Sequence, residues 1–240
     1  PDALERAVWR LRPGGTLLIR ARGGTCTGSL NLDKPIVIIG DGAFDPRAWA
    51  ERRAPMIQAP AGQPCIVAAP GVDVEIRDVT FGSENGGAPC LVGYSGGFRL
   101  ERVGLRHGGQ DPAIYMEGGR LDIASTLIDA RTTTAAVILD RAALEMRETV
   151  IEGARSGVEI TPDGAAPSRI TTSTFIGGPQ GEGYGPRPIG VSVASNGGFG
   201  RVDISQSVIC GFVEAVVIEG ATGVINDSRL CMADKGVVLY

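Results

Sequence analysis

Residues 121–128 read Leu-Asp-Ile-Ala-Ser-Thr-Leu-Ile, and residues 144–151 repeat this order of side-chain types as Leu-Glu-Met-Arg-Glu-Thr-Val-Ile. Residues 202–209 repeat it again as Val-Asp-Ile-Ser-Gln-Ser-Val-Ile. Apolar and polar residues alternate in each copy, which is the period of a β-strand and not of a helix. The last position of this pattern belongs to a column of apolar residues, namely Phe81, Leu105, Ile128, Ile151, Ile176, Ile209 and Leu230.

A second column has the same period as the first. In it a small residue precedes a short apolar strand, and the small residues are Cys65, Cys90, Ala113, Ala136, Gly157, Gly190, Ala215 and Gly236. A third column, Thr126, Thr149, Thr174, Ser207 and Ser228, places a hydroxyl group in each turn. The common step is 21–25 residues, with one step of 33. A repeat of this length predicts an all-β parallel solenoid of roughly eight to nine coils, each strand about 4.8 Å from its equivalent in the next coil.

The opening of the chain carries a family resemblance. Pro13-Gly14-Gly15-Thr16 leads into an apolar strand, and Lys34-Pro35-Ile36 leads into another that ends at Gly40. These motifs resemble the first coil of the pectin lyase-like right-handed parallel β-helix superfamily. The resemblance implies a capping α-helix in residues 1–13, first coils and an insertion in 14–53, and regular coils in 54–240. It also implies a bacterial protein of the cell envelope or a secreted one. Because no cap follows the last coil, we expect the chain to be part of a longer protein.

Composition and charge exclude some partners. The 240 residues carry a net charge of −4 with scattered basic residues, which argues against a nucleic-acid partner. No apolar run reaches the roughly 18 residues of a membrane span, so we expect no membrane insertion. Five cysteines without metal-type spacing indicate no zinc site. Cys65 would stack on Cys90, and Cys210 on Cys231; we expect thiols packed as small apolar groups there, although neighbouring strands also permit disulfides.

Alternation assigns an outward column to the strands that follow the small residues: Val67, Val92, Tyr115, Ile138, Glu159, Ser192, Val217 and Val238. Val67, Val92, Ile138, Val217 and Val238 make it mostly apolar, and large exposed apolar patches usually mark interfaces. This favours a non-catalytic module that recognises a polysaccharide or a protein through this face, or that associates with itself there or at the open C-terminal end. Coverage of the column by the molecule's own loops is the other reading.

A neighbouring outward column contains Tyr94, Glu117, Asp140, Thr161, Ala194 and Glu219. Glu117 and Asp140 occupy adjacent coils, so their carboxylates can approach within about 5–6 Å, and Glu159 lies one coil further on. Such carboxylates can bind Ca²⁺ or share a proton. The resemblance therefore implies an alternative, a polysaccharide lyase or glycoside hydrolase acting on an acidic polysaccharide, with Arg120 or Arg141 assisting and Ca²⁺ as the one possible cofactor. A solvated acidic patch is the simpler reading.

The motifs of the related enzymes are missing from this sequence. The Asn-Thr-Asp, Asp-Asp, Gly-His-Gly and Arg-Ile-Lys segments of polygalacturonases do not occur, and His107 is the only histidine. We expect His107 to lie exposed at a turn. A structural spacer inside a longer envelope or adhesive protein is a further alternative, which the uncapped C-terminal end suggests.

Insertions at 41–53, 82–89 and 177–188 break the period. Trp49, Tyr184 and Arg187 within them, together with Tyr94 and Tyr115, are candidate binding residues, because long loops on a rigid scaffold often carry function.

Overall fold

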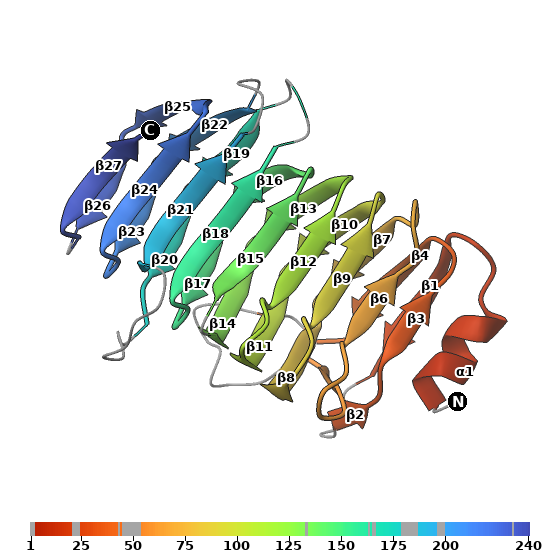
Figure 1. Ribbon diagram of the computed structural model, residues 1–240. Helices are drawn as coiled ribbons and strands as arrows, with labels where there is room; N and C mark the ends of the chain where they lie inside the picture. The colour runs from red at the N-terminus through yellow and green to blue at the C-terminus, as the bar shows by residue number, and fades with distance from the viewer. Residues whose placement is uncertain are drawn as a thin grey trace.

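The chain forms a right-handed parallel β-helix preceded by one short helix, α1 (Ala3–Arg10) (Figure 1). The computed structural model describes residues 3–20, 25–42, 44, 54–132, 134–162, 164, 167–178, 187–195, 200–231 and 233–240. Three parallel sheets of nine strands each wrap around one core. Leu4 and Val8 of α1 are buried in that core, so the helix fits a cap on the first coil. Within the described ranges, no helix has the length and apolar character needed to cross a bilayer.

Each coil contributes one strand to each sheet. Sheet A contains β1 (Gly15–Ile19), β4 (Ile36–Gly40), β7 (Val74–Arg77), β10 (Gly97–Glu101), β13 (Arg120–Ala124), β16 (Ala143–Arg147), β19 (Ser168–Thr171), β22 (Gly200–Ser205) and β25 (Ala221–Asn226). Sheet B contains β2 (Thr25–Thr27), β5 (Met56–Gln58), β8 (Thr80–Gly86), β11 (Gly104–Gly109), β14 (Leu127–Thr132), β17 (Val150–Glu152), β20 (Thr174–Ile176), β23 (Val208–Cys210) and β26 (Arg229–Cys231). Sheet C contains β3 (Leu30–Leu32), β6 (Ile66–Ala68), β9 (Leu91–Tyr94), β12 (Ile114–Glu117), β15 (Ala135–Asp140), β18 (Ser156–Thr161), β21 (Ile189–Ala194), β24 (Glu214–Glu219) and β27 (Lys235–Leu239).

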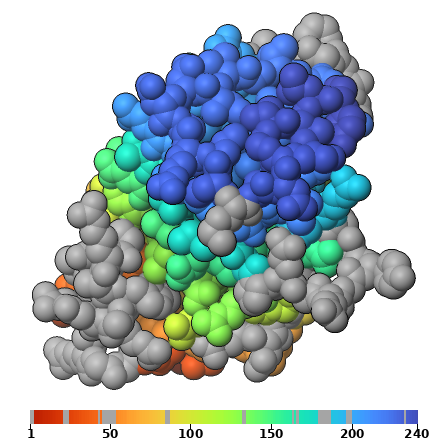
Figure 2. All heavy atoms as spheres, turned by 90° about the vertical axis from the view of Figure 1, so that its left-hand side faces the viewer, coloured from red at the N-terminus to blue at the C-terminus, as the bar shows by residue number. Residues whose placement is uncertain are grey.

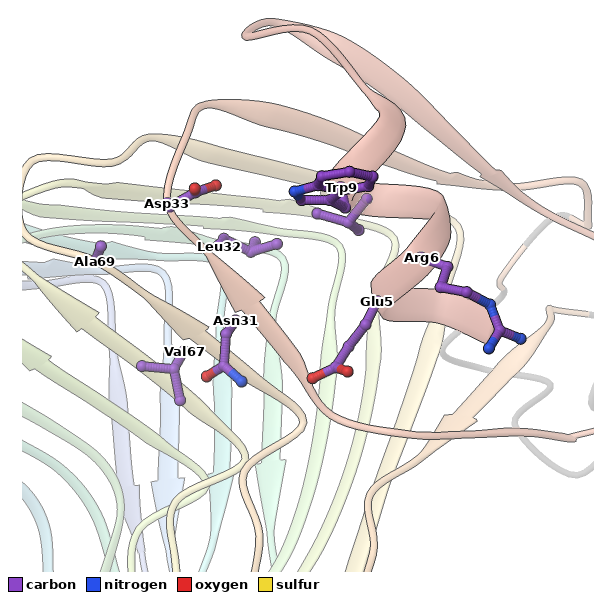
Figure 3. A pocket seen from close by; sticks show the side chains of 9 residues that line it. Glu5, Arg6, Trp9, Asn31, Leu32, Asp33, Val67 and Ala69 are labelled. Carbon is purple, nitrogen blue, oxygen red and sulfur yellow. The ribbon is translucent and has the colours of Figure 1, made fainter. Parts of the chain in front are cut away.

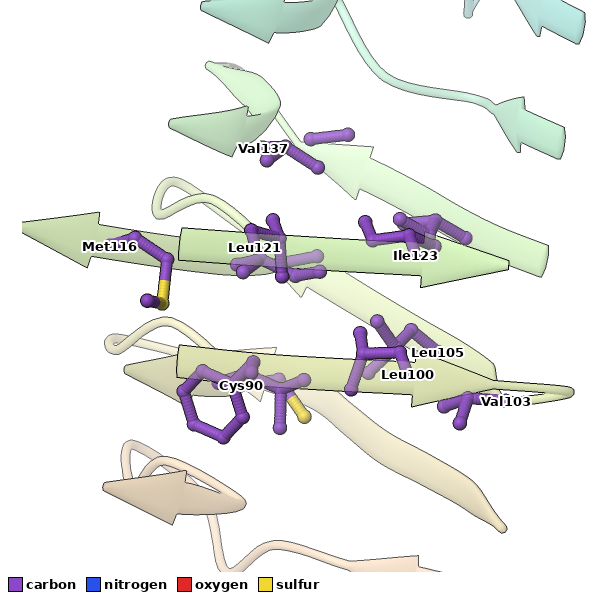
Figure 4. Close-up of a cluster of buried hydrophobic side chains, with 14 of the residues drawn as sticks. Cys90, Leu100, Val103, Leu105, Met116, Leu121, Ile123 and Val137 are labelled. Carbon is purple, nitrogen blue, oxygen red and sulfur yellow. The ribbon is translucent and has the colours of Figure 1, made fainter. Parts of the chain in front are cut away.

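The inward columns stack as the repeat predicts. Leu121 pairs in register with Phe98 on one side and Leu144 on the other, and the three side chains are buried. Figure 4 shows such residues from the three sheets pointing into one shared interior. The column of small residues also lies at a tight corner, since a Cβ atom added to Gly157 or Gly190 would collide with the backbone of the next coil. Apolar burial along these columns is the main stabilising contribution.

One coil departs from the predicted register. Phe175, not Ile176, pairs with Ile151 and Ile209 and is buried, whereas Ile176 is 46% exposed. The hydroxyl column accordingly runs through Ser173 and not Thr174. Phe175 and Ile176 are adjacent apolar residues that fit the sequence pattern equally well. The larger side chain, that of Phe175, fills the interior.

The corner between sheets A and B has the same conformation in seven coils. A non-glycine residue with φ between 47° and 56° occupies it each time, namely Asp78, Arg102, Ser125, Glu148, Thr172, Gln206 and Asp227. Such left-handed conformations are uncommon outside glycine. The hydroxyl column lies directly after this corner and bonds successive coils: the Ser173 Oγ accepts from the Thr149 amide at 3.3 Å, and the Ser207 Oγ accepts from the Ser173 amide at 3.2 Å.

The cysteine prediction was wrong in one respect. Cys65 and Cys90 form a disulfide, as do Cys210 and Cys231, and only Cys26 is free. Their Cα atoms lie 4.7 and 4.6 Å apart, because in-register parallel strands bring equivalent residues within bridging range.

Figure 2 looks onto the C-terminal end of the solenoid, where the last coil forms the blue end face. Val237 and Leu239 are 46% and 72% exposed, whereas Val216 and Ile218, their partners in the preceding coil, are buried.

Candidate functional site

Two rows of side chains run along the outer face of sheet C. The first, here called the valine row, is Asn31, Val67, Val92, Tyr115, Ile138, Glu159, Ser192, Val217 and Val238, and its members pair in register from strand to strand. The second, here called the acidic row, includes Tyr94, Glu117, Asp140 and Thr161, which also pair in register. Asp33 and Ala69 directly follow the paired residues Leu32 and Ala68, so they begin this row. The predicted alignment of both rows is confirmed.

The valine row is more shielded than an open apolar patch would be. Val92 and Val217 are buried, with 7% and 6% of their surface exposed. Val67, Ile138 and Val238 are half-buried. Large side chains in neighbouring positions, such as Tyr115, reduce the apolar area that this face offers to a partner. The role of the row as an interface stays a prediction.

Polar candidates from three successive strands gather at the middle of this face. The Arg141 Nη2 atom lies 2.6 Å from the Glu117 Oε1 atom and 3.6 Å from the Asp140 Oδ2 atom, so one guanidinium group holds both carboxylates. Desolvation, followed by the charges of Glu117 and Asp140 and by Tyr94, raises the pKa of Tyr115, while Arg141 opposes the shift. Tyr94, Tyr115, Glu117, Asp140 and Arg141 therefore form one cluster, here called the tyrosine–carboxylate cluster.

The local backbone places Arg141 in this cluster. β15 ends at Asp140, and Arg141 turns the chain with a φ of 53°. The preceding coil turns at Gly118, whose amide donates to the Asp140 carbonyl at 2.7 Å. A left-handed non-glycine residue is uncommon. In Arg141 this conformation brings the guanidinium group over Asp140, the last residue of β15, and over Glu117 in the preceding coil.

Glu159 lies one coil beyond the cluster in the valine row. It is half-buried between Ile138 and Ser192, and desolvation raises the pKa of its carboxyl group. Within the described part of the chain, Glu159 forms no ion pair. It is therefore a carboxyl group that takes up a proton more readily than an exposed one, and that can donate as well as accept a hydrogen bond.

The other predicted residues do not join the cluster. Arg120 lies in β13 of sheet A, where it pairs with Asp122 and Glu145. Arg187 lies 3.2 Å from the Oε1 atom of buried Glu214, which Lys235 also contacts at 3.2 Å. Burial alone would raise the pKa of Glu214, but hydrogen bonds from Lys235 and Arg187 outweigh it and lower the pKa. Arg187 thus helps to fix a corner of the solenoid. Trp49 and Tyr184 lie outside the described residues.

The prediction of an exposed His107 was wrong. The residue lies within β11, is 1% exposed, and its Nε2 atom is 3.0 Å from the Asp111 carbonyl oxygen. The glycines that follow it suggested a turn, but β11 continues through Gly108 and Gly109. Burial lowers the pKa of His107. It is a core residue and not part of the face of sheet C.

A hollow at the N-terminal end of the same face was not anticipated. Its volume is about 660 Å³, and it lies between α1 and the first two strands of sheet C (Figure 3). The lining residues are Glu5, Arg6, Val8, Trp9, Asn31, Leu32, Asp33, Val67 and Ala69. Trp9 is 81% exposed. The sequence signal was a tryptophan outside the buried face of an amphipathic helix, but its position over the two rows depends on how α1 packs against β3.

Ca²⁺ binding by Glu117 and Asp140 stays a prediction. Ca²⁺ takes about six to eight oxygen ligands. Glu117 and Asp140 supply two carboxylates that both already contact Arg141. Among the described residues, no group of three or more His, Cys, Asp or Glu side chains is placed to hold a metal ion.

Comparison with known proteins adds no family to this description. No protein-family model matches the chain, and neither a curated protein nor a solved structure with significant similarity was found.

Proposed function

We propose that the chain is a non-catalytic binding module that recognises a polysaccharide along the outer face of sheet C. The observation that carries the proposal is the convergence of two tyrosines, two carboxylates and one arginine in the tyrosine–carboxylate cluster. The resemblance of the first coil to the pectin lyase-like superfamily, in which sugar-cleaving members hold substrate on this sheet, supports the same choice.

The chemistry of these groups suits a sugar ring. An aromatic ring offers an apolar surface with a polar tip, so it can cover the C–H face of a pyranose and still reach a hydroxyl group. Carboxylates and guanidinium groups accept from and donate to the remaining hydroxyls with charge-assisted hydrogen bonds. Because the rows follow the solenoid axis with a repeat of about 4.8 Å per coil, they favour an extended chain bound along that axis.

The two recognition areas share the same rows. Asn31 and Val67 of the valine row, and Asp33 and Ala69 of the acidic row, line the hollow beside Trp9. Val92 separates them from Tyr115 in the next coils. A bound chain would therefore pass from the Trp9 hollow to the tyrosine–carboxylate cluster without leaving the face.

The charge of the face favours a neutral or amino-sugar polysaccharide. Among the described residues, carboxylates outnumber cations along it: Glu5, Asp33, Glu117, Asp140 and Glu159 stand against Arg6, Arg141 and Lys34, whose ammonium group donates to the Trp9 carbonyl. An acidic polymer would meet like charges, and like-charge contacts are a common basis of discrimination. Uronic-acid polymers are therefore expected to bind least well at the outer face of sheet C.

Calorimetry with chito-oligosaccharides, cello-oligosaccharides and oligogalacturonates tests this proposal. We expect the first two to bind, and Tyr115→Ala and Arg141→Ala each to weaken binding about tenfold or more, as lost stacking or charged hydrogen bonds typically do. Arg201→Ala is the matched control, because Arg201 is an exposed arginine on sheet A that pairs with Asp203. Binding that is unchanged in Tyr115→Ala and Arg141→Ala would refute this site.

A second candidate, a polysaccharide-cleaving enzyme, rests on the adjacent carboxylates Glu117 and Asp140. Two carboxyl groups flanking a glycosidic bond are the usual machinery of hydrolysis. An assay for reducing ends and unsaturated products on the same polymers tests it. Cleavage that is lost in both Glu117→Gln and Asp140→Asn would establish the enzyme, and binding without cleavage would favour the module.

A further inference from the structure

The outer face of sheet A carries two adjoining hollows that the proposed function does not use. Their volumes are about 370 and 260 Å³, and they share Arg99, Arg120 and Asp122. The smaller hollow is also lined by Glu101, Ala124, Glu145 and Arg147. Its charged side chains come from β10, β13 and β16, which are three successive strands of the sheet.

Each carboxylate that lines the smaller hollow is already held by an arginine. Glu101 contacts Arg77 and Arg102, and Asp122 contacts Arg120. Glu145 lies 3.9 Å from Arg120 and 3.7 Å from Arg169. The negative charge of the hollow is therefore matched by these ion pairs.

Two guanidinium groups that line the smaller hollow, those of Arg99 and Arg147, pair with none of these carboxylates. Within the described ranges, neither the Arg99 side chain nor the Arg147 side chain forms an ion pair or a hydrogen bond. Arg99 stands in register between Glu75 and Asp122, but those carboxylates are held by Arg77 and Arg120. Arg147 stands between Ala124 and Thr171, with no acidic neighbour in its own column.

A small side chain, Ala124, also lines the smaller hollow. Ala124 pairs in register with Glu101 of β10 and with Arg147 of β16, so it lies on the middle one of the three strands. Arg99 and Arg147 lie two coils apart, which is about 9.6 Å across the strands, and two residues apart along them. The side chains of Arg99 and Arg147 both line the smaller hollow, together with Ala124.

We propose that this hollow is an oxyanion-binding site in which Arg99 and Arg147 together hold a sulfate, phosphate or carboxylate group. The planar guanidinium fork matches such groups with two parallel hydrogen bonds, which a neutral ligand does not provide. The group is either a free ion or part of an acidic polymer that continues into the larger hollow through Arg99. The site lies on a different sheet from the polysaccharide face and does not depend on it.

Calorimetric titration with inorganic phosphate and, separately, with dextran sulfate tests the site. We expect the double variant Arg99→Ala/Arg147→Ala to weaken binding about tenfold or more, since each lost charge-assisted bond is substantial. Arg201→Ala, which removes an ion-paired arginine from the same sheet, should bind as the unchanged protein does. Binding should also weaken with added NaCl.

The outcomes separate the two sources of the anion. Phosphate binding that is lost in the double variant identifies a site for a free ion. Dextran sulfate binding that is lost in the double variant, without phosphate binding, identifies a polymer-borne group. The proposal is overturned if neither probe binds, or if Arg201→Ala weakens binding as much as the double variant does. Circular dichroism of each variant checks that the fold is retained.

Discussion

Glu159 places a half-buried carboxyl group in a row of mainly apolar side chains. Burial raises its pKa, so the folded state binds this proton more tightly than the unfolded state does. Ionisation therefore costs stability at every pH above the unfolded pKa of about 4.3, and the cost disappears as the pH falls below it. We expect Glu159→Gln to raise the melting temperature at pH 7 and to leave it unchanged near pH 3.5.

Glu219→Gln is the matched control for this prediction, since Glu219 is an exposed carboxylate of the same sheet. Thermal unfolding of the three proteins at both pH values is the measurement. An equal gain at pH 3.5 would mean that the change in side-chain packing, and not the charge, is responsible.

His107 gives the opposite pH dependence. Burial lowers its pKa, and the Nδ1 atom has no hydrogen-bond partner among the residues that the structure describes. The unfolded state therefore binds the proton more tightly, and the free energy of unfolding should fall as the pH drops below the unfolded pKa of about 6.5. Urea unfolding between pH 8 and pH 5 should show this loss, and His107→Gln should flatten it. A slope that persists in the variant would assign the loss to other groups.

The hydroxyl column is the element that links the corners of successive coils. The Ser173 Oγ donates to the Thr171 carbonyl at 2.8 Å and accepts from the Thr149 amide, and the residue is 1% exposed. Ser173→Ala leaves that buried amide without its acceptor, so we expect a loss of about 1–3 kcal/mol in the free energy of unfolding. Urea denaturation measures it. Ser205→Ala, at a half-exposed position before the same corner of the next coil, should cost less than about 0.5 kcal/mol. Equal losses would contradict the role of the column.

The hydroxyl column also shows what the sequence can and cannot predict. Stacking requires equivalent residues in every coil, so the period alone aligned both rows of sheet C, including Glu117 beside Asp140. It placed Thr174 in the hydroxyl column where the structure has Ser173, because neighbouring residues of the same type satisfy the pattern equally. The Trp9 hollow depends on helix packing, and which arginines of sheet A pair with a described carboxylate depends on how their neighbours are arranged. Neither the hollow nor the pairing of the arginines repeats from coil to coil, so the sequence period does not predict them.

At the scale of the whole molecule, the disulfides are the covalent links between coils. Cys65–Cys90 closes a separation of 25 residues, and Cys210–Cys231 closes one of 21. Constraint of the unfolded chain by loops of this length is worth about 3 kcal/mol each. Cys65→Ser/Cys90→Ser should therefore lower the free energy of unfolding in urea by about 2–4 kcal/mol, and reductant should then have a smaller effect on the variant than on the unchanged protein. An equal effect of reductant on both would contradict this assignment.

The two disulfides should also differ in their order of reduction. Cys65 and Cys90 are fully buried inside the solenoid, whereas Cys210 and Cys231 are half-exposed on sheet B near the uncovered last coil. Because thiol–disulfide exchange requires access of the attacking thiolate to a sulfur atom, dithiothreitol under native conditions should open Cys210–Cys231 first. Alkylation followed by peptide mass spectrometry should label Cys210 and Cys231 in minutes and Cys65 and Cys90 only when urea is added, with the free Cys26 as the internal reference. Simultaneous labelling of all four would mean that the coils around Cys65 and Cys90 open as readily as the end of the solenoid.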